Sequence, residues 1–117
     1  MVLWVLFASL NAIGSPALSS FPSAQATIYL DFDGYRVVST SWNGGNALDC
    51  QAAPMSDAQI TEVFNRVAED YRPFNVNVTT DANKFLAAPL NRRIRVIVTP
   101  TSAWYPGVGG SANLDVR

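Results

Sequence analysis

The chain has 117 residues, of which 49% are apolar, and a formal net charge of −1. This length suits one small domain, and the near-neutral charge excludes a typical nucleic-acid-binding surface, so we expect no nucleic-acid partner. No apolar run reaches the roughly 18–20 residues that a membrane-spanning helix requires. The sequence contains no histidine, which is the commonest general base and zinc ligand near neutral pH, and Cys50 is its single cysteine.

Residues 1–26 have the layout of a secretory signal peptide. The apolar stretch "MVLWVLFASLNAIG" is followed by small and polar residues that end in Ala24-Gln25-Ala26, an A-x-A cleavage site. No lysine or arginine precedes the apolar run, so a short buried helix or a mis-assigned start codon would give a similar pattern. We therefore expect a secreted, extracellular protein with a mature part of 27–117, and no membrane association after signal cleavage.

The first expected element of the mature part is a strand over residues 27–32. Its side chains alternate with a period of two, with Ile28, Leu30 and Phe32 on one face and Tyr29 and Asp31 on the other. Asp33-Gly34 ends it, because Asp can bond to its own following backbone and Gly tolerates positive φ. Residues 39–55 hold Ser, Asn, Gly and Pro without periodicity. They predict a long loop with Trp42 as its aromatic anchor.

A helix over residues 56–71 is the most regular feature of the sequence. Ser56 and Gln59 have the spacing of a capping box at its start, and Pro73 fixes its end. The residues expected on its buried face are Ile60, Val63, Phe64, Val67, Ala68 and Tyr71. Phe74, just beyond the helix, is also expected in the core.

Two further strands follow the helix. Residues 75–79 alternate valine with asparagine or threonine and predict a half-exposed strand; a loop containing Lys84 then leads to a strand over 93–99. The strand–helix–strand order predicts parallel pairing. The fold class is therefore α/β, with a mixed, mostly parallel sheet and one long amphipathic helix. Glu69 and Asp70 oppose the helix dipole, which suggests Arg72 or Arg95 as a partner.

The motif D-F-D-G, which begins at Asp31, has several interpretations. In a phosphatase of the haloacid dehalogenase type, Asp31 would attack phosphorus and Asp33 would shuttle the proton, helped by Thr99 or Thr101 and by Lys84. The acidic pair that such an enzyme needs for Mg²⁺ is missing. A turn closed by an Asx-type bond explains the motif equally well. Calcium at the two carboxylates is possible but unsupported, because two carboxylates are few for calcium.

Several stretches together resemble the N-terminal part of a family of secreted bacterial zinc metallopeptidases of the metzincin-like kind. The resemblance covers roughly residues 27–112, and its most specific block is "VAEDYRPFNVNVTTD". The corresponding stretches are Asp31–Gly34, Trp42, residues 67–81, Ile94–Thr99 and Trp104–Ala112. Tyr35 stands where relatives often carry histidine.

The resemblance implies a peptide or protein substrate and a zinc cofactor. In this family, three histidines of a later helix, H-E-x-x-H-x-x-G-x-x-H, hold the zinc, and the glutamate polarises the zinc-bound water. This chain has no histidine, so it supplies no zinc ligand of that kind and cannot be active alone. The resemblance further implies that Gly109, Gly110, Ser111 and Ala112 bind substrate by strand addition. An ordinary flexible loop explains these four residues equally well.

The expected function is therefore that of an N-terminal fragment of a secreted zinc metalloendopeptidase. The alternatives are a short, non-catalytic exported binding module and a phosphatase-like hydrolase that uses Asp31 and Asp33. Cys50 is either buried and inert or paired with a cysteine beyond residue 117.

Overall fold

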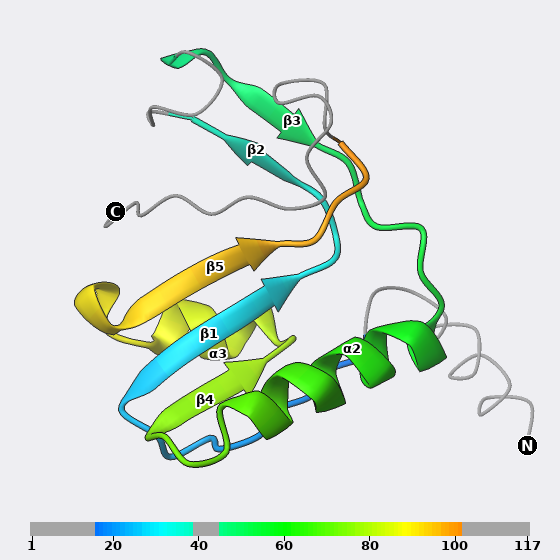
Figure 1. The fold of residues 1–117 in the computed structure, drawn as a ribbon. Helices are drawn as coiled ribbons and strands as arrows, with labels where there is room; N and C mark the ends of the chain where they lie inside the picture. The colour runs from blue at the N-terminus through cyan, green and yellow to red at the C-terminus, as the bar shows by residue number, and fades with distance from the viewer. Residues whose placement is uncertain (1–15, 39–44, 102–117) are drawn as a thin grey trace, which may run out of the picture.

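The structure, a computed structural model, describes residues 16–38 and 45–101. Its elements are β1 (Ala26–Asp31), β2 (Tyr35–Val37), β3 (Leu48–Cys50), α2 (Asp57–Asp70), β4 (Val76–Thr79), α3 (Ala82–Ala87), the 3-10 turn η2 (Leu90–Arg92) and β5 (Arg93–Ile97). A three-stranded sheet has the order β4-β1-β5, and both pairings are parallel (Figure 1). The expected α/β class, the mostly parallel sheet and the long helix are thus confirmed.

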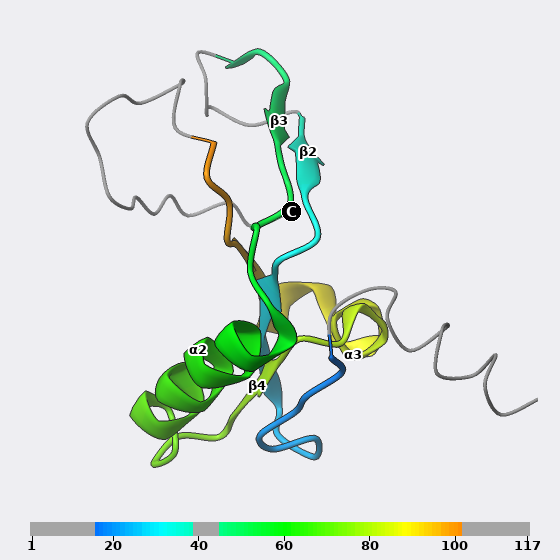
Figure 2. The ribbon, with the colours of Figure 1, turned by 90° about the vertical axis from the view of Figure 1, so that its right-hand side faces the viewer.

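The two helices lie on opposite faces of this sheet, as Figure 2 shows with the sheet seen edge-on. The side of the sheet that faces α2 is apolar: Leu30, Phe32 and Val78 pack with Ile60 and Phe64 of the helix. The side that faces α3 carries Tyr29, whose ring centroid lies 5.2 Å from that of Phe85. A three-layer arrangement follows, with β1 as the central strand.

Helix α2 begins at the expected capping box. The Gln59 N–H donates to Ser56 Oγ, and the Ser56 N–H donates to Gln59 Oε1 at 2.9 Å. This reciprocal pair satisfies two donors that a helix start leaves free, and a Ser cap contributes about 1 kcal/mol. Ile60 and Phe64 are buried, and Val63, Val67 and Ala68 pack against the same core.

Two aromatic residues at the end of α2 were predicted wrongly. Tyr71 is the C-cap rather than part of the buried face and is 39% exposed, and Phe74 is 58% exposed. Their rings contact each other edge to face, with centroids 6.3 Å apart. The helix ends in a turn, 71–75, that directs both rings outward, so the helical period no longer applies to them.

Strand β4 is buried rather than half-exposed, because a further segment covers its outer edge. We call residues 16–25 the N-terminal segment. The Ser20 N–H donates to the Val78 carbonyl, and the Thr80 N–H donates to the Leu18 carbonyl, both at 2.9 Å. An antiparallel bridge joins Ser19 to Thr79, whose side chain is fully buried. The segment therefore protects β4 as an edge strand would.

A two-stranded antiparallel hairpin, β2–β3, extends beyond the carboxyl end of β1 (Figure 1). The expected loop over 39–55 therefore contains a strand, Leu48–Cys50, in its described part. Gly34 has a φ of +86° at the start of the hairpin. A Cβ there would lie 3.0 Å from the Ala52 nitrogen, so glycine is required both by φ and by space.

The expected loop around Lys84 contains the short helix α3. The Asp81 side chain accepts the Asn83 N–H at its start. At its end, Arg93 Nη1 donates to the carbonyls of Phe85, Leu86 and Ala88 at 3.1, 3.2 and 3.3 Å. This guanidinium satisfies carbonyl groups that a helix end leaves without partners. Within 16–38 and 45–101, no helix is long and apolar enough to cross a membrane.

Candidate functional site

The four residues expected to bind substrate, Gly109, Gly110, Ser111 and Ala112, lie outside the described residues, and so does Trp42. The described part of the site is the carboxyl-terminal edge of the sheet, where β1 and β5 end side by side. Open α/β sheets bind ligands at this edge. The chemistry of the D-F-D-G motif is decided by what surrounds Asp31 there.

Asp31 forms a buried ion pair with Arg95 of the neighbouring strand. Arg95 Nη1 lies 3.1 Å from Asp31 Oδ2, and the two side chains are 21% and 3% exposed. The other carboxylate oxygen, Oδ1, accepts the Asp33 N–H at 3.0 Å, which is the Asx-type bond expected at this turn. Both oxygens of Asp31 are therefore engaged within the protein.

Aromatic rings from three elements surround the Arg95 guanidinium. Its Cζ lies 3.6 Å from the ring centroid of Tyr35 in β2, 5.0 Å from that of Phe85 in α3 and 5.4 Å from that of Tyr29 in β1. Cation–π contacts of this kind are stabilising, most of all where water is excluded. One side chain thus joins the hairpin, the sheet and α3.

Burial dominates the ionisation of this cluster. It raises the pKa of the Asp31 carboxyl above its ordinary value, and the Asp33 N–H and the Arg95 charge oppose that rise. Burial and the nearby Asp31 and Asp33 carboxylates raise the pKa of Tyr29 to about 12, so its phenol stays neutral at physiological pH. Burial is thus the main cause of the raised pKa of both groups.

The geometry of the phosphatase alternative is unfavourable. A nucleophilic carboxylate needs access to the phosphoester, whereas Asp31 is 2% exposed and paired. The hydroxyls proposed for it are also engaged: Thr99 donates to the Gln51 carbonyl at 2.7 Å, and Thr101 accepts the Gln51 N–H at 3.1 Å. These threonines hold the strand ends of β3 and β5 together. Lys84 lies on α3, on one face of the sheet.

The described residues contain no metal-binding group. Within 16–38 and 45–101, no cluster of three or more His, Cys, Asp or Glu side chains could hold an ion. For calcium at Asp31 and Asp33, the ion pair with Arg95 occupies the oxygen that a cation would need. The zinc that the resemblance implies would therefore require ligands from elsewhere.

Cys50 is buried at the end of β3. Burial raises the pKa of its thiol, and the negative charges of Asp31 and Asp49 raise it further. A neutral, buried thiol is a poor nucleophile. This environment suits the inert alternative for Cys50.

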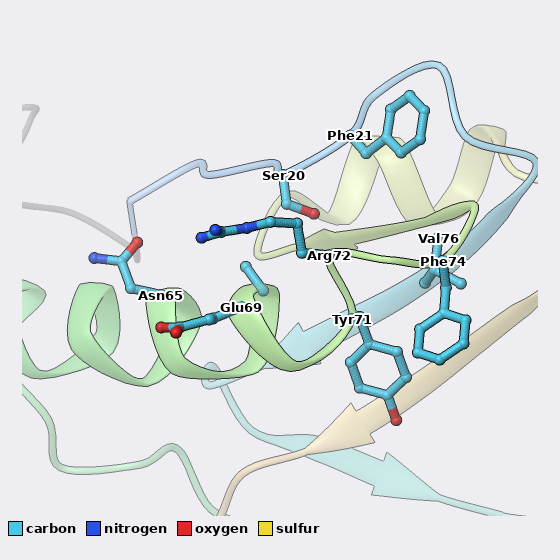
Figure 3. Close-up of a pocket in the computed structure, with 9 residues that line it drawn as sticks. Ser20, Phe21, Asn65, Glu69, Tyr71, Arg72, Phe74 and Val76 are labelled. Carbon is cyan, nitrogen blue, oxygen red and sulfur yellow. The ribbon is translucent and has the colours of Figure 1, made fainter.

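The prediction that Arg95 pairs with Glu69 or Asp70 of α2 was wrong, because Arg95 pairs with Asp31. Among the described residues, neither Glu69 nor Asp70 forms an ion pair. Glu69 lies beside a shallow pocket between the end of α2 and the N-terminal segment. Figure 3 shows Arg72 extending between Ser20 and the helix at this pocket, while Tyr71 and Phe74 lie at its far end. One acidic and one basic side chain on an open surface do not select a class of ligand.

Comparison of the chain with protein-family models and with curated proteins gave no match, and comparison with solved structures gave none either.

The Asp31–Arg95 pair was missed by the sequence analysis, although a signal for it was present. Period-two alternation places Tyr29 and Asp31 on one face of their strand, and Arg93 and Arg95 on one face of theirs. Once the two strands are taken as parallel neighbours, an aspartate and an arginine share the same side of the sheet. No sequence pattern indicated the cluster of rings around Arg95, because Tyr35 and Phe85 belong to separate elements that meet only in the folded structure.

Proposed function

We propose that this α/β unit is the N-terminal portion of the catalytic domain of a secreted zinc metalloendopeptidase, completed by a zinc-binding helix that follows it in the chain. The observation that carries the proposal is the block at 67–81 on which the resemblance rests. In the structure this block includes the end of α2, the following turn and β4.

The apolar face of the sheet supports one part of the proposal, that a further helix packs on this unit. Ile94 and Val96 pair in register with Ile28 and Leu30, so they point to the side on which α2 packs. They are 40% and 39% exposed, whereas Leu30 is 4% exposed. Helix α2 therefore leaves apolar surface over β5, and a second helix packed beside it would bury that surface.

The later helix and the present chain would have different roles, because the present chain contains no histidine. The later helix would supply the three histidine ligands and the glutamate, and zinc would then polarise the peptide carbonyl and the attacking water. Residues 109–112 would bind the peptide substrate through their backbone N–H and C=O groups. The described residues would act as the scaffold that positions both.

The first test is to read the coding sequence downstream of the Arg117 codon. The expected result is an open frame that encodes H-E-x-x-H-x-x-G-x-x-H. The extended protein should then bind one zinc ion and cleave casein, and glutamine in place of the motif's glutamate should abolish cleavage but keep the zinc. A stop codon directly after Arg117 would overturn the proposal and leave a small exported binding module as the better account.

Substrate binding at the glycine segment has its own test in the extended protein. Gly110→Pro removes a backbone N–H, so it should lower kcat/KM at least tenfold while the zinc content is unchanged. Ser111→Ala changes only a side chain and is the matched control. Equal activity of the two variants would remove residues 109–112 from the proposed substrate site.

A further inference from the structure

Strand β4 and its flank bind the N-terminal segment through contacts that a second copy of the chain could also make. Asn77 Oδ1 accepts the Phe21 N–H at 2.9 Å. Thr80 Oγ1 accepts the Leu18 N–H at 2.8 Å, and the Leu18 side chain packs against the core. Together with the backbone bonds described above, these contacts recognise an extended strand. None of them depends on which copy supplies that strand.

A single β-turn connects this strand to β1. The turn is Phe21-Pro22-Ser23-Ala24, and the Ala24 N–H closes it by donating to the Phe21 carbonyl at 2.9 Å. Proline stands at the second position of the turn, and its φ of about −65° suits an extended chain as well as a turn. Opening the turn loses this one backbone bond, whereas the contacts of residues 18–21 can all form again with β4 of a second copy.

Exposed aromatic rings lie beside this turn. Phe21, Tyr71 and Phe74 line one pocket of about 450 Å³ between the N-terminal segment and the end of α2 (Figure 3). They are 43%, 39% and 58% exposed, and aromatic residues are enriched at protein interfaces. Three such rings offer roughly 300 Å² per copy, which is less than the about 800 Å² that each partner of a stable complex buries. A partner at this surface therefore needs further contacts.

We propose that two copies of this chain form a two-fold symmetric dimer by exchanging residues 16–21, so that each strand binds β4 of the other copy. The turn at 21–24 is extended in the dimer, and the two connections cross near the symmetry axis. Phe21 lies at this connection, and Tyr71 and Phe74 lie beside it, so the rings of both copies are covered there. The exchanged strands supply the hydrogen bonds and the burial of Leu18, and the rings supply the contacts that only the dimer has.

The exchange uses no residue of the expected substrate site, so it is independent of the proposed zinc chemistry. It requires a chain in which residues 16–25 are retained.

A pair of engineered cysteines in the whole chain of 117 residues tests the exchange. Ser19 Oγ and Thr79 Oγ1 lie 2.8 Å apart across the antiparallel bridge, so Ser19→Cys with Thr79→Cys, in a Cys50→Ala background, places two thiols in contact. The protein is equilibrated in mild denaturant over about a hundredfold range of concentration, returned to buffer and oxidised. Exchange predicts a covalent dimer on a non-reducing gel, in a fraction that rises with concentration. A disulfide within single chains at every concentration would overturn the proposal.

Sedimentation velocity tests the aromatic contacts without engineered cysteines. Phe74→Ser should raise the dissociation constant of the dimer at least tenfold, because it removes a ring that the dimer covers. Leu86→Ser is the matched control: this leucine is 64% exposed and lies on α3, on the opposite face of the sheet, so the dissociation constant should not change. Equal effects of the two variants would overturn the placement of the rings at the interface. A dimer by sedimentation whose cysteine pair closes within each chain would overturn the exchange.

Discussion

Arg95 and Asp31 lie on neighbouring parallel strands and face the same side of the sheet, with Nη1 and Oδ2 3.1 Å apart. The pair is nearly enclosed, and aromatic rings cover the guanidinium. An enclosed ion pair is costly to desolvate, and removing one partner leaves the other charge without compensation. The consequences for stability differ according to which partner is removed.

Arg95→Met should destabilise the protein by about 3 kcal/mol at pH 7, because it leaves the Asp31 carboxylate buried without a counter-charge. Methionine keeps the aliphatic contacts with the rings. Arg36→Met is the matched control: its pair with Asp49 has side chains that are 62% and 71% exposed, so the loss should stay within about 0.5 kcal/mol. Urea denaturation measures both, and equal losses would contradict the assignment of a buried pair.

The pH dependence of Asp31 has a definite sign. Burial raises the pKa of this carboxyl above its ordinary value of 3.8, so the folded state holds the proton more tightly than the unfolded chain does. The group therefore contributes stability below its ordinary pKa, and this contribution is lost as the pH rises through the raised value.

Asp31→Asn removes this titration. The free energy of unfolding of the wild type, measured relative to the variant, should therefore fall as the pH rises from about 3 to about 7. In an Arg95→Met background the fall should move to higher pH, because the arginine lowers the pKa of Asp31. A difference that grows with pH would show that the ion pair outweighs burial.

Phe64 and Phe74 were both expected in the core, and only one of them is buried. Phe64 is 8% exposed and Phe74 is 58% exposed. Phe64→Ala should cost about 3–5 kcal/mol through lost burial and the cavity that remains. Phe74→Ala should cost less than about 1 kcal/mol, because it removes little more than an exposed edge-to-face contact. Thermal or urea denaturation would distinguish them, and similar losses would contradict the turn at 71–75.

Asn77→Ala tests the anchoring of the N-terminal segment directly. The variant leaves the Phe21 N–H without its acceptor at a partly buried hydrogen bond, so we expect a loss of about 1–3 kcal/mol. Hydrogen exchange at the Phe21 amide should speed up as well. Asn75→Ala is the control, since its bond to the Gln25 N–H is exposed, and its effect should be under about 1 kcal/mol. An unchanged Phe21 amide in Asn77→Ala would contradict the observed bond.

Strands and helices that are long enough for their hydrophobic pattern to recur could be predicted from the sequence. The alternation in β1 and β5 and the helical period in α2 each recur several times, and the Ser56–Gln59 box marks a boundary. Strand β3 could not be found, since its three residues are too few to show a period. Its pairing with β2 is supported by the Arg36–Asp49 ion pair, which involves residues from two strands.

Burial was predicted less well than element type. The pattern of β4 indicates one polar face, yet Asn77 and Thr79 are buried because the N-terminal segment and α3 cover them. Those partners are distant in sequence, so no local pattern reports them. At the candidate site, the turn bond of Asp31 was expected, its pairing with Arg95 was not, and the substrate role of 109–112 stays a prediction.

The pairing of β1 has a consequence for the kinetics of folding. Ala26 pairs with Val76, and Thr27 pairs with Arg93, so the central strand has no partner in the sheet until most of the chain is present. Contacts between residues so far apart along the chain carry a large loop-closure entropy and form slowly. The sheet therefore cannot assemble while only the first half of the chain has been synthesised. A nascent chain that stays open in this way remains competent for passage through a narrow translocation channel.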